Sequence, residues 1–162
     1  MIALAQVVAP VLPVAARRDP VARAYGWPAL AAAADRASRR LGGGDGTSVW
    51  LGADRFQDAA ELSLLVPRQP TVFALNLGGR PNQYDLWPGF AESARRGDAL
   101  VAALDTGTGG ADVAARLQPH FDAANRDTAV ALMRGRDTIA VRAIWTFRGW
   151  HGTWPRKSPG RR

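Results

Sequence analysis

Residues 48–75, SVWLGADRFQDAAELSLLVPRQPTVFAL, decide the fold that this sequence predicts. Apolar runs at 48–51 and 71–75 are typical of short buried strands. Between them, residues 55–66 are predicted to form a helix, which Pro67 ends and which Asp54 and Gln57 are predicted to cap at its start. A strand, a helix and a strand in this order indicate two parallel strands joined by a crossover helix.

The flanking sequence extends this pattern on both sides. Upstream, apolar residues recur at the spacing of one helix face from Trp27 to Leu41. Downstream, the sequence predicts a third strand at 98–104, a short helix at 111–117, and hairpin strands at 128–133 and 138–147. The predicted fold is an α/β layered sandwich with a mostly parallel central sheet and a C-terminal antiparallel β-hairpin.

The composition fits one folded domain. The chain has 162 residues, of which 47% are hydrophobic and 22% are charged, as in ordinary globular domains. This excludes a collagen-like chain and a chain that is disordered throughout. The absence of cysteine also excludes a disulfide scaffold, a cysteine-ligated zinc site and a cysteine nucleophile. We assign the folded domain to residues 19–148.

The two ends of the chain differ from this domain. Residues 1–16 are uncharged, are too few to span a bilayer, which takes ~20 residues, and contain Pro10 and Pro13. Residues 1–18 are therefore either a buried apolar arm or the remnant of a transmembrane helix that begins outside this sequence. Residues 149–162 hold four of the seven net positive charges and are predicted to be a disordered tail. Because the rest of the chain is nearly balanced, the charge does not favour nucleic-acid binding.

Candidate functional side chains gather just after the first two predicted strands. The carboxyl ends of strands are where open α/β sheets bind ligands, and a mixture of amide, hydroxyl, carboxylate and aromatic groups suits sugars. The candidate binding or interface residues are Asp54, Arg55, Gln57 and Glu61 after the first strand, and Arg80, Asn82, Gln83, Tyr84, Asp85 and Trp87 in the loop after the second. A structural role, in capping a helix or holding a loop, is the alternative for each of them.

The loop at 78–90 allows a sharper prediction. If the loop serves a functional face, its polar and aromatic side chains should divide into some that fold inward and some that are presented at the surface. A loop with a purely structural role would bury all five, which are Asn82, Gln83, Tyr84, Asp85 and Trp87.

Other kinds of site find no support in the sequence. The run GGGDG at 42–46 precedes a strand and lacks the Lys-Ser/Thr pair of a phosphate-binding loop, so a turn is expected there. The only histidines, His120 and His151, have no third ligand at a metal-site spacing. No serine stands in the Gly-x-Ser-x-Gly setting of a hydrolase nucleophile. We expect no metal, no cofactor and no catalytic residue in this chain.

Four stretches stand in a characteristic order. They are Gly26-Trp27 at the start of a helix, ADRFQDAAEL at 53–62, LNLGGRPNQYDLW at 75–87 and GDALV at 97–101. Together they resemble the soluble C-terminal region of bacterial family 39 glycosyltransferases. The resemblance extends over residues 19–154, and the run NQYDLW at 82–87 is its most specific part.

The resemblance implies a function and a location. Such enzymes are polytopic membrane proteins, related to protein O-mannosyltransferases and to lipid A aminoarabinose transferase, that use polyprenyl-phosphate sugars at the extracytoplasmic face of the bacterial cytoplasmic membrane. Their catalytic carboxylate lies in an early loop between transmembrane helices, which this sequence lacks. The resemblance therefore implies an accessory domain, inactive alone, that covers the membrane active site or helps to seat the acceptor. Its implied partners are the transmembrane portion of the glycosyltransferase, the membrane surface, and the polyprenyl-phosphate sugar or the acceptor.

Two further hypotheses stay open. The chain could be a free-standing α/β module that binds a small polar ligand, such as a sugar or a nucleotide. It could also bind RNA through the basic tail, with Trp145, Trp150 and Trp154 stacking on bases, although the alternation of the predicted hairpin favours a core position for Trp145.

Overall fold

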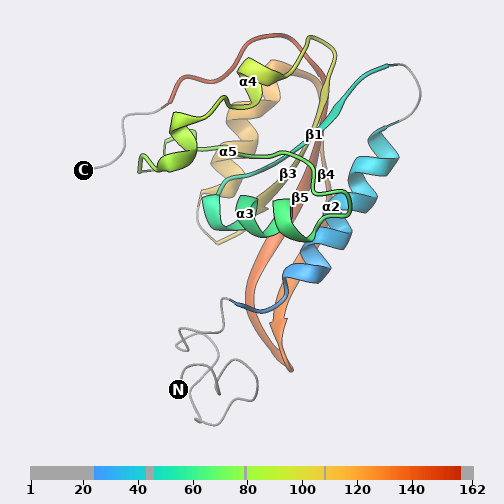
Figure 1. Ribbon diagram of the computed structural model, residues 1–162, viewed down its shortest axis with the longest axis vertical. Helices are drawn as coiled ribbons and strands as arrows, with labels where there is room; N and C mark the ends of the chain where they lie inside the picture. Colours follow the sequence, from blue (N-terminus) through green and yellow to red (C-terminus); the bar gives the residue numbers. More distant parts are fainter. Residues whose placement is uncertain (1–23, 43–45, 79, 108, 158–162) are drawn as a thin grey trace.

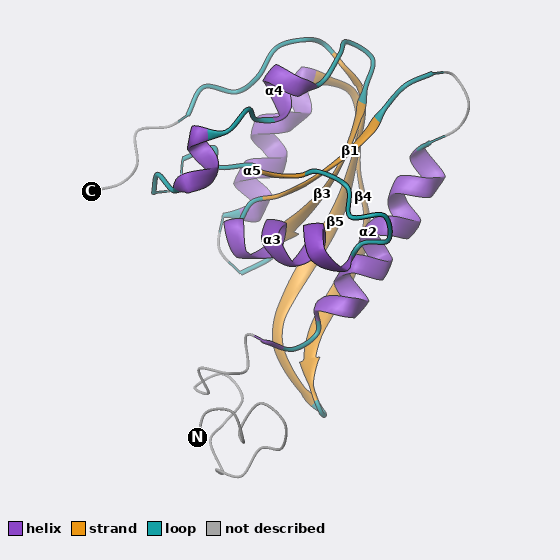
Figure 2. Cartoon of the chain, in the orientation of Figure 1, coloured by secondary structure: helices purple, strands orange, loops and turns teal. Residues whose placement is uncertain are grey.

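Five strands form one sheet, with helices against both of its faces (Figure 1, Figure 2). The computed structural model describes residues 24–42, 46–78, 80–107 and 109–157. In chain order the elements are α2 (Trp27–Leu41), β1 (Val49–Ala53), α3 (Phe56–Leu65), β2 (Val72–Ala74), the 3-10 helix η3 (Gln83–Leu86), α4 (Phe90–Ser93), β3 (Ala99–Asp105), α5 (Gly110–Leu117), the 3-10 helix η4 (Gln118–His120), β4 (Phe121–Arg134) and β5 (Asp137–Trp150). The strands lie side by side in the order β2-β1-β3-β5-β4.

The sheet is mixed, so the prediction of a mostly parallel sheet is wrong. β1 pairs in parallel with β2 and β3, but β5 runs antiparallel to both β3 and β4. The antiparallel part dominates because β4 and β5 have 14 residues each, whereas β2 has 3. β4 begins at Phe121, well before the predicted start at Thr128. Residues 122–127, DAANRD, have low strand propensity, but on an edge strand their side chains can face solvent while the backbone pairs with β5.

One face of the sheet is covered by α2 and α3. The predicted helix from Trp27 to Leu41 is confirmed, and its side chains Leu30 and Ala37 are fully buried. The chain enters this helix through Gly26, whose φ of 87° lies in the left-handed region. A Cβ at this position would lie 2.7 Å from the Leu132 Cα, so a glycine is needed where the start of α2 packs against β4.

The opposite face is covered by α4 and α5 over an aromatic core. The ring centroid of Phe90, from α4, lies 5.1 Å from that of Trp150 and 4.9 Å from that of Trp154. Trp145 stacks on Phe147, with 6.1 Å between the ring centroids. All three tryptophans considered for base stacking are thus in contact with other aromatic side chains of the domain.

Beyond β5 the chain remains in contact with the domain. The Trp150 amide donates to the Asp98 carbonyl at 3.0 Å, and the His151 amide donates to the His120 carbonyl at 2.9 Å. These contacts fall in residues 149–157 of the predicted tail, whereas residues 158–162, the predicted arm at 1–18 and most of the predicted turn at 42–46 lie outside the described residues. Across the residues that the structure describes, no helix is both long and apolar enough to cross a membrane.

Candidate functional site

The carboxyl ends of β1 and β3 lie at a switch in the connectivity of the sheet. β1 is the middle strand of the parallel part, between β2 and β3. The chain passes from β1 to β2 through α3, which packs on one face, and from β2 towards β3 through α4, which packs on the other. Because the two connections pass over opposite faces of the sheet, these strand ends are at the usual ligand position in open α/β sheets.

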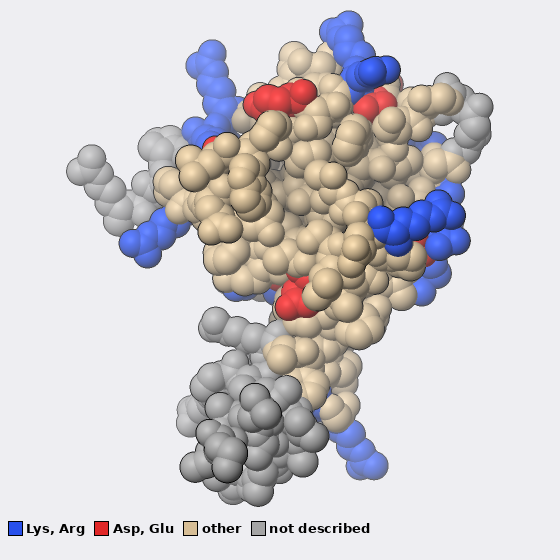
Figure 3. Space-filling model, in the orientation of Figure 1, with Lys and Arg blue, Asp and Glu red and all other residues tan. Residues whose placement is uncertain are grey.

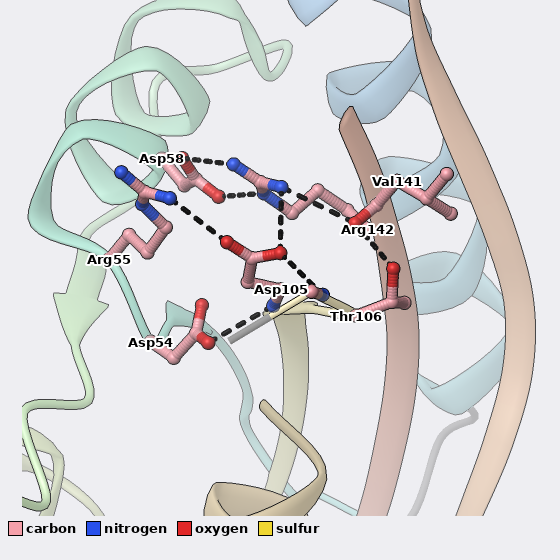
Figure 4. Close-up of polar contacts among 8 residues, drawn as sticks. Asp54, Arg55, Asp58, Asp105, Thr106, Val141 and Arg142 are labelled. Atoms are coloured by element: carbon pink, nitrogen blue, oxygen red, sulfur yellow. Dashed lines mark hydrogen bonds and ion pairs between the residues drawn. The ribbon is translucent and has the colours of Figure 1, made fainter. Parts of the chain in front are cut away.

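Arg142, from β5, holds two carboxylates at this position (Figure 4). Its Nε and Nη2 atoms donate to the carboxylate of Asp58, from α3, and its Nη1 atom lies 3.2 Å from Asp105 Oδ1, at the end of β3. All three side chains are buried, and that of Asp58 is only 1% exposed. Burial alone would lower the pKa of Arg142, but the hydrogen bond and the charge of Asp58 raise it, so the guanidinium stays charged.

Arg55 closes this network on the solvent side. Its Nη1 atom donates to Asp105 Oδ2 at 2.9 Å, and its side chain is 41% exposed. The other oxygen of Asp105 accepts a hydrogen bond from the Gly107 amide at 2.9 Å. Arg55 is therefore accessible from solvent, whereas Arg142 is enclosed behind the two carboxylates.

Asp54 is the carboxylate of this group that the ion pairs leave out. Its Oδ2 atom accepts a hydrogen bond from the Asp105 amide at 3.0 Å. Its Oδ1 atom is buried and has no hydrogen-bond partner among the described residues. Burial raises the pKa of Asp54 to about 6, and the charges of Asp58 and Asp105 add to this rise, while the hydrogen bond from the Asp105 amide opposes it.

These five residues, Asp54, Arg55, Asp58, Asp105 and Arg142, are called the strand-end cluster below. At neutral pH the cluster has one negative charge in excess, and protonation of Asp54 removes that charge. The free oxygen of Asp54 can accept a hydrogen bond from a ligand hydroxyl or, when protonated, donate one. In the parts of the chain that the structure describes, no three His, Cys, Asp or Glu side chains are placed to hold a metal ion.

A second group of candidate residues is held together by Asp85, in the loop at 76–90. Asp85 Oδ2 accepts hydrogen bonds from Asn76 Nδ2 at 3.0 Å and from the Asn82 amide at 2.8 Å, and Asp85 Oδ1 accepts one from Lys157 Nζ. Asn82 Oδ1 accepts a hydrogen bond from the Tyr84 amide at 2.9 Å, which completes the cap of η3. Burial would raise the pKa of Asp85, but the bonds from Lys157, Asn82 and Asn76 lower it below its usual value.

Several other side chains of this loop are exposed to solvent. Leu86 is 83% exposed and Trp87 is 57% exposed, and the Trp87 indole lies against the Tyr84 ring with 5.2 Å between the centroids. Arg80 and Gln83 are also exposed. The loop thus divides, as predicted, into side chains that hold its shape and side chains that it presents.

The other sequence candidates are on α3, and one prediction about them is wrong. Asp54 and Gln57 do not cap this helix, because the N-cap residue is Arg55 and no side chain bonds to the first turn. Instead, the Asp54 carboxylate accepts a hydrogen bond from the Asp105 amide at the end of β3. The carboxylate that the sequence pattern predicted to cap α3 is therefore bonded to the neighbouring strand. Gln57 is exposed and Glu61 is partly exposed.

Sequence reasoning missed three members of the strand-end cluster. Asp105 ends β3 in the same way that Asp54 follows β1, so this repeated pattern of an apolar strand ending in aspartate was the signal that could have found it. Asp58 and Arg142 gave no such signal. Their pairing joins α3 to β5 across 84 positions of the chain, and only the three-dimensional fold shows it.

Comparison with known proteins adds no relative: no family model, no curated protein and no solved structure matches this chain.

Proposed function

We propose that this chain is an extracytoplasmic accessory domain of a glycosyltransferase that uses polyprenyl-phosphate sugars, and that it covers the membrane active site or helps to seat the acceptor. The observation that carries the proposal is the loop at 76–90. This loop contains the run NQYDLW, the most specific part of the resemblance to family 39 glycosyltransferases. Its side chains are also arranged as a contact surface requires.

A contact surface needs a fixed shape and exposed apolar area. Asn82 and Asp85 fix the shape of the loop through bonds to its own backbone and to Asn76. Leu86 and Trp87 provide two adjacent apolar side chains that are mostly exposed. Single exposed apolar residues are ordinary on protein surfaces, but neighbouring ones in a rigid loop favour a partner. Since both oxygens of Asp85 are bonded inside the domain, the role we assign to the loop is contact and not catalysis.

The first test is made in the bacterium that produces the chain. Membranes are assayed for sugar transfer from a polyprenyl phosphate, with the coding sequence for residues 19–162 present, deleted and restored. We expect transfer to fall to background on deletion and to return on restoration. A purified chain of residues 1–162 should show no turnover above a heat-killed control, because it is tested without the transmembrane portion and the catalytic loop that the resemblance assigns to such enzymes. Turnover by the purified chain, or unchanged transfer after deletion, would contradict the proposal.

The strand-end cluster favours a second candidate function, the binding of a small polar ligand such as a sugar or a nucleotide. The observation behind it is the buried Oδ1 atom of Asp54, which has no hydrogen-bond partner among the described residues, at the switch between β1 and β3. Saturable binding to the purified chain, measured by calorimetry, should be lost in Asp54→Asn and kept in Arg39→Met, which alters an exposed ion pair on α2. Equal binding by both variants, or none by the parent chain, would remove this candidate.

A further inference from the structure

Leu86 and Trp87, together with Tyr84 beneath the indole, form what we call the loop patch. The patch is rigid, since η3 is capped by Asn82 and anchored through Asp85. A rigid patch loses little conformational entropy on binding, so its exposed apolar area can contribute fully to association. The protein thus presents a leucine and a tryptophan on a fixed support.

Basic side chains surround this patch. Lys157 contacts Asp85, and the backbone of Arg156 accepts a hydrogen bond from Arg116, whose guanidinium also donates to the Leu77 carbonyl at the start of the loop. The side chains of Arg80 and Arg156 are exposed. In the space-filling view, Lys and Arg atoms lie beside uncharged surface next to the C-terminal end, with some Asp and Glu atoms on the same side (Figure 3).

Two acidic side chains lie in the same region. Asp85 is bonded to Lys157, Asn76 and Asn82, and the exposed Glu92 accepts a hydrogen bond from the Gly89 amide at 2.9 Å. Arg80, Arg116, Arg156 and Lys157 carry two more charges than Asp85 and Glu92, so the net charge of these side chains is positive.

We propose that the loop patch docks on an anionic lipid bilayer, with Trp87 and Leu86 at the level of the headgroups and the surrounding arginines against lipid phosphates. This inference rests on the proposed function and names the surface that the loop contacts. Tryptophan favours the membrane interface because its ring is apolar and its N–H is polar. Lys and Arg near an anionic leaflet add electrostatic attraction.

A second exposed apolar surface among the described residues lies on α3. Phe56, Leu64 and Leu65 are exposed there by 44%, 63% and 38%. Within its bounds this helix has no basic residue, and its acid at the surface is the partly exposed Glu61, since Asp58 is buried in the ion pair with Arg142. Leu64 is therefore a matched control position, an exposed leucine on a different surface of the domain.

The experiment locates Trp87 relative to lipid. The full chain is mixed with vesicles of phosphatidylcholine and phosphatidylglycerol in equal parts, in which the acyl chains carry bromine, and tryptophan fluorescence is recorded. Bromine quenches only indoles at the bilayer, so the signal reports the position of Trp87, and every variant keeps the apolar residues 1–16. We expect quenching in the parent chain, loss of most of it in Trp87→Phe, and full quenching in Leu64→Ser.

Two further variants test the apolar and the charged contributions. Leu86→Ser combined with Trp87→Ser should lower vesicle partitioning at least about tenfold, while Leu64→Ser leaves it unchanged. Arg80→Ser and Arg156→Ser should each lower partitioning about fivefold on anionic vesicles and leave it unchanged on pure phosphatidylcholine. Circular dichroism spectra of all variants should match that of the parent chain.

Three outcomes would overturn the inference. They are quenching that persists in Trp87→Phe, partitioning that depends on Leu64 instead of Leu86 and Trp87, and partitioning that is indifferent to lipid charge. The proposed function is judged separately. If sugar transfer in membranes depends on Leu86 and Trp87 while the isolated chain shows no quenching, the loop contacts the transmembrane protein and only the lipid inference fails.

Discussion

The strand-end cluster and the loop at 76–90 follow neighbouring strands and both turn polar groups inward, yet only the loop presents apolar side chains to solvent. In the cluster the charges are inside, with Arg142 5% exposed and Asp58 1% exposed. In the loop the polar groups face inward and an apolar side chain, Leu86, is 83% exposed. The comparison assigns stability to the cluster and contact to the loop. Removing one member of a buried ion pair leaves the other charge unpaired and lowers the free energy of unfolding. An exposed leucine and tryptophan contribute little to folding and are available for contact.

The largest effect should follow from breaking the buried ion pairs. Arg142→Met leaves Asp58 buried without its cation and Asp105 paired with Arg55 alone, so the free energy of unfolding should fall by about 3–5 kcal/mol. Arg39→Met, which breaks the exposed pair with Asp35, should change it by less than about 1 kcal/mol. Urea unfolding of both variants measures the difference. Similar small losses in the two would mean that the cluster does not hold α3 and β5 together.

The second effect concerns Asp54 and depends on pH. Burial raises its pKa from 3.8 to about 6 in the folded chain, so between these values the folded state binds more protons than the unfolded state. This contribution to stability is therefore present at low pH and is lost as the pH rises through 6. Above that pH, Asp54→Asn should be more stable than the parent chain by about 2 kcal/mol, and the gain should shrink towards pH 4.

The Asp54 prediction is checked by urea unfolding at several pH values. Asp137→Asn, at the exposed turn of the hairpin, is the control and should show no such trend. If the free energies of unfolding of Asp54→Asn and the parent chain differ by the same amount from pH 4 to above pH 7, burial does not raise the pKa of Asp54.

A smaller loss is expected at the base of the loop. Asp85→Ala removes the acceptor for Asn76, the Asn82 amide and Lys157, so the free energy of unfolding should fall by about 1–2 kcal/mol. The variant should also loosen the loop, which amide hydrogen exchange at residues 82–87 would show as faster exchange. If Asp85→Ala melts like the parent chain and exchange is unchanged, the loop is not held in the way described.

Much of the first half of the fold could be predicted from the sequence, because its elements are marked locally. The spacing of apolar residues in α2 and the apolar runs of β1 and β2 are such marks, and the structure has these elements close to the predicted bounds. The first half of β4 could not be predicted in this way. Its polar residues can form a strand because β4 lies at the edge of the sheet and pairs with β5. Both the edge position and the pairing depend on the whole sheet, so the segment alone does not indicate a strand.

The candidate site shows the same limit. Asn82, Asp85 and Trp87 could be selected from one short run of sequence, since the bonds that sort them into inward and presented side chains are mostly local. The other residues that form the strand-end cluster with Asp54 and Arg55 come from three separate elements, α3, β3 and β5. Asp54 could be selected as a strand-end carboxylate, but the burial that raises its pKa, and that leaves one oxygen without a partner among the described residues, comes from the fold.

The smallest effect on folding should accompany the largest effect on function, and this contrast is the central claim. The measurement is sugar transfer from a polyprenyl phosphate in membranes that carry the native protein, with Leu86→Ser combined with Trp87→Ser compared with Leu64→Ser, and with melting recorded for each purified chain. We expect the double variant to melt like the parent chain, within about 0.5 kcal/mol as for other surface changes, and to lose most of the transfer, while Leu64→Ser keeps both. Transfer that survives in the double variant, or falls only in step with lost stability, would contradict the account and leave the loop with a structural role alone.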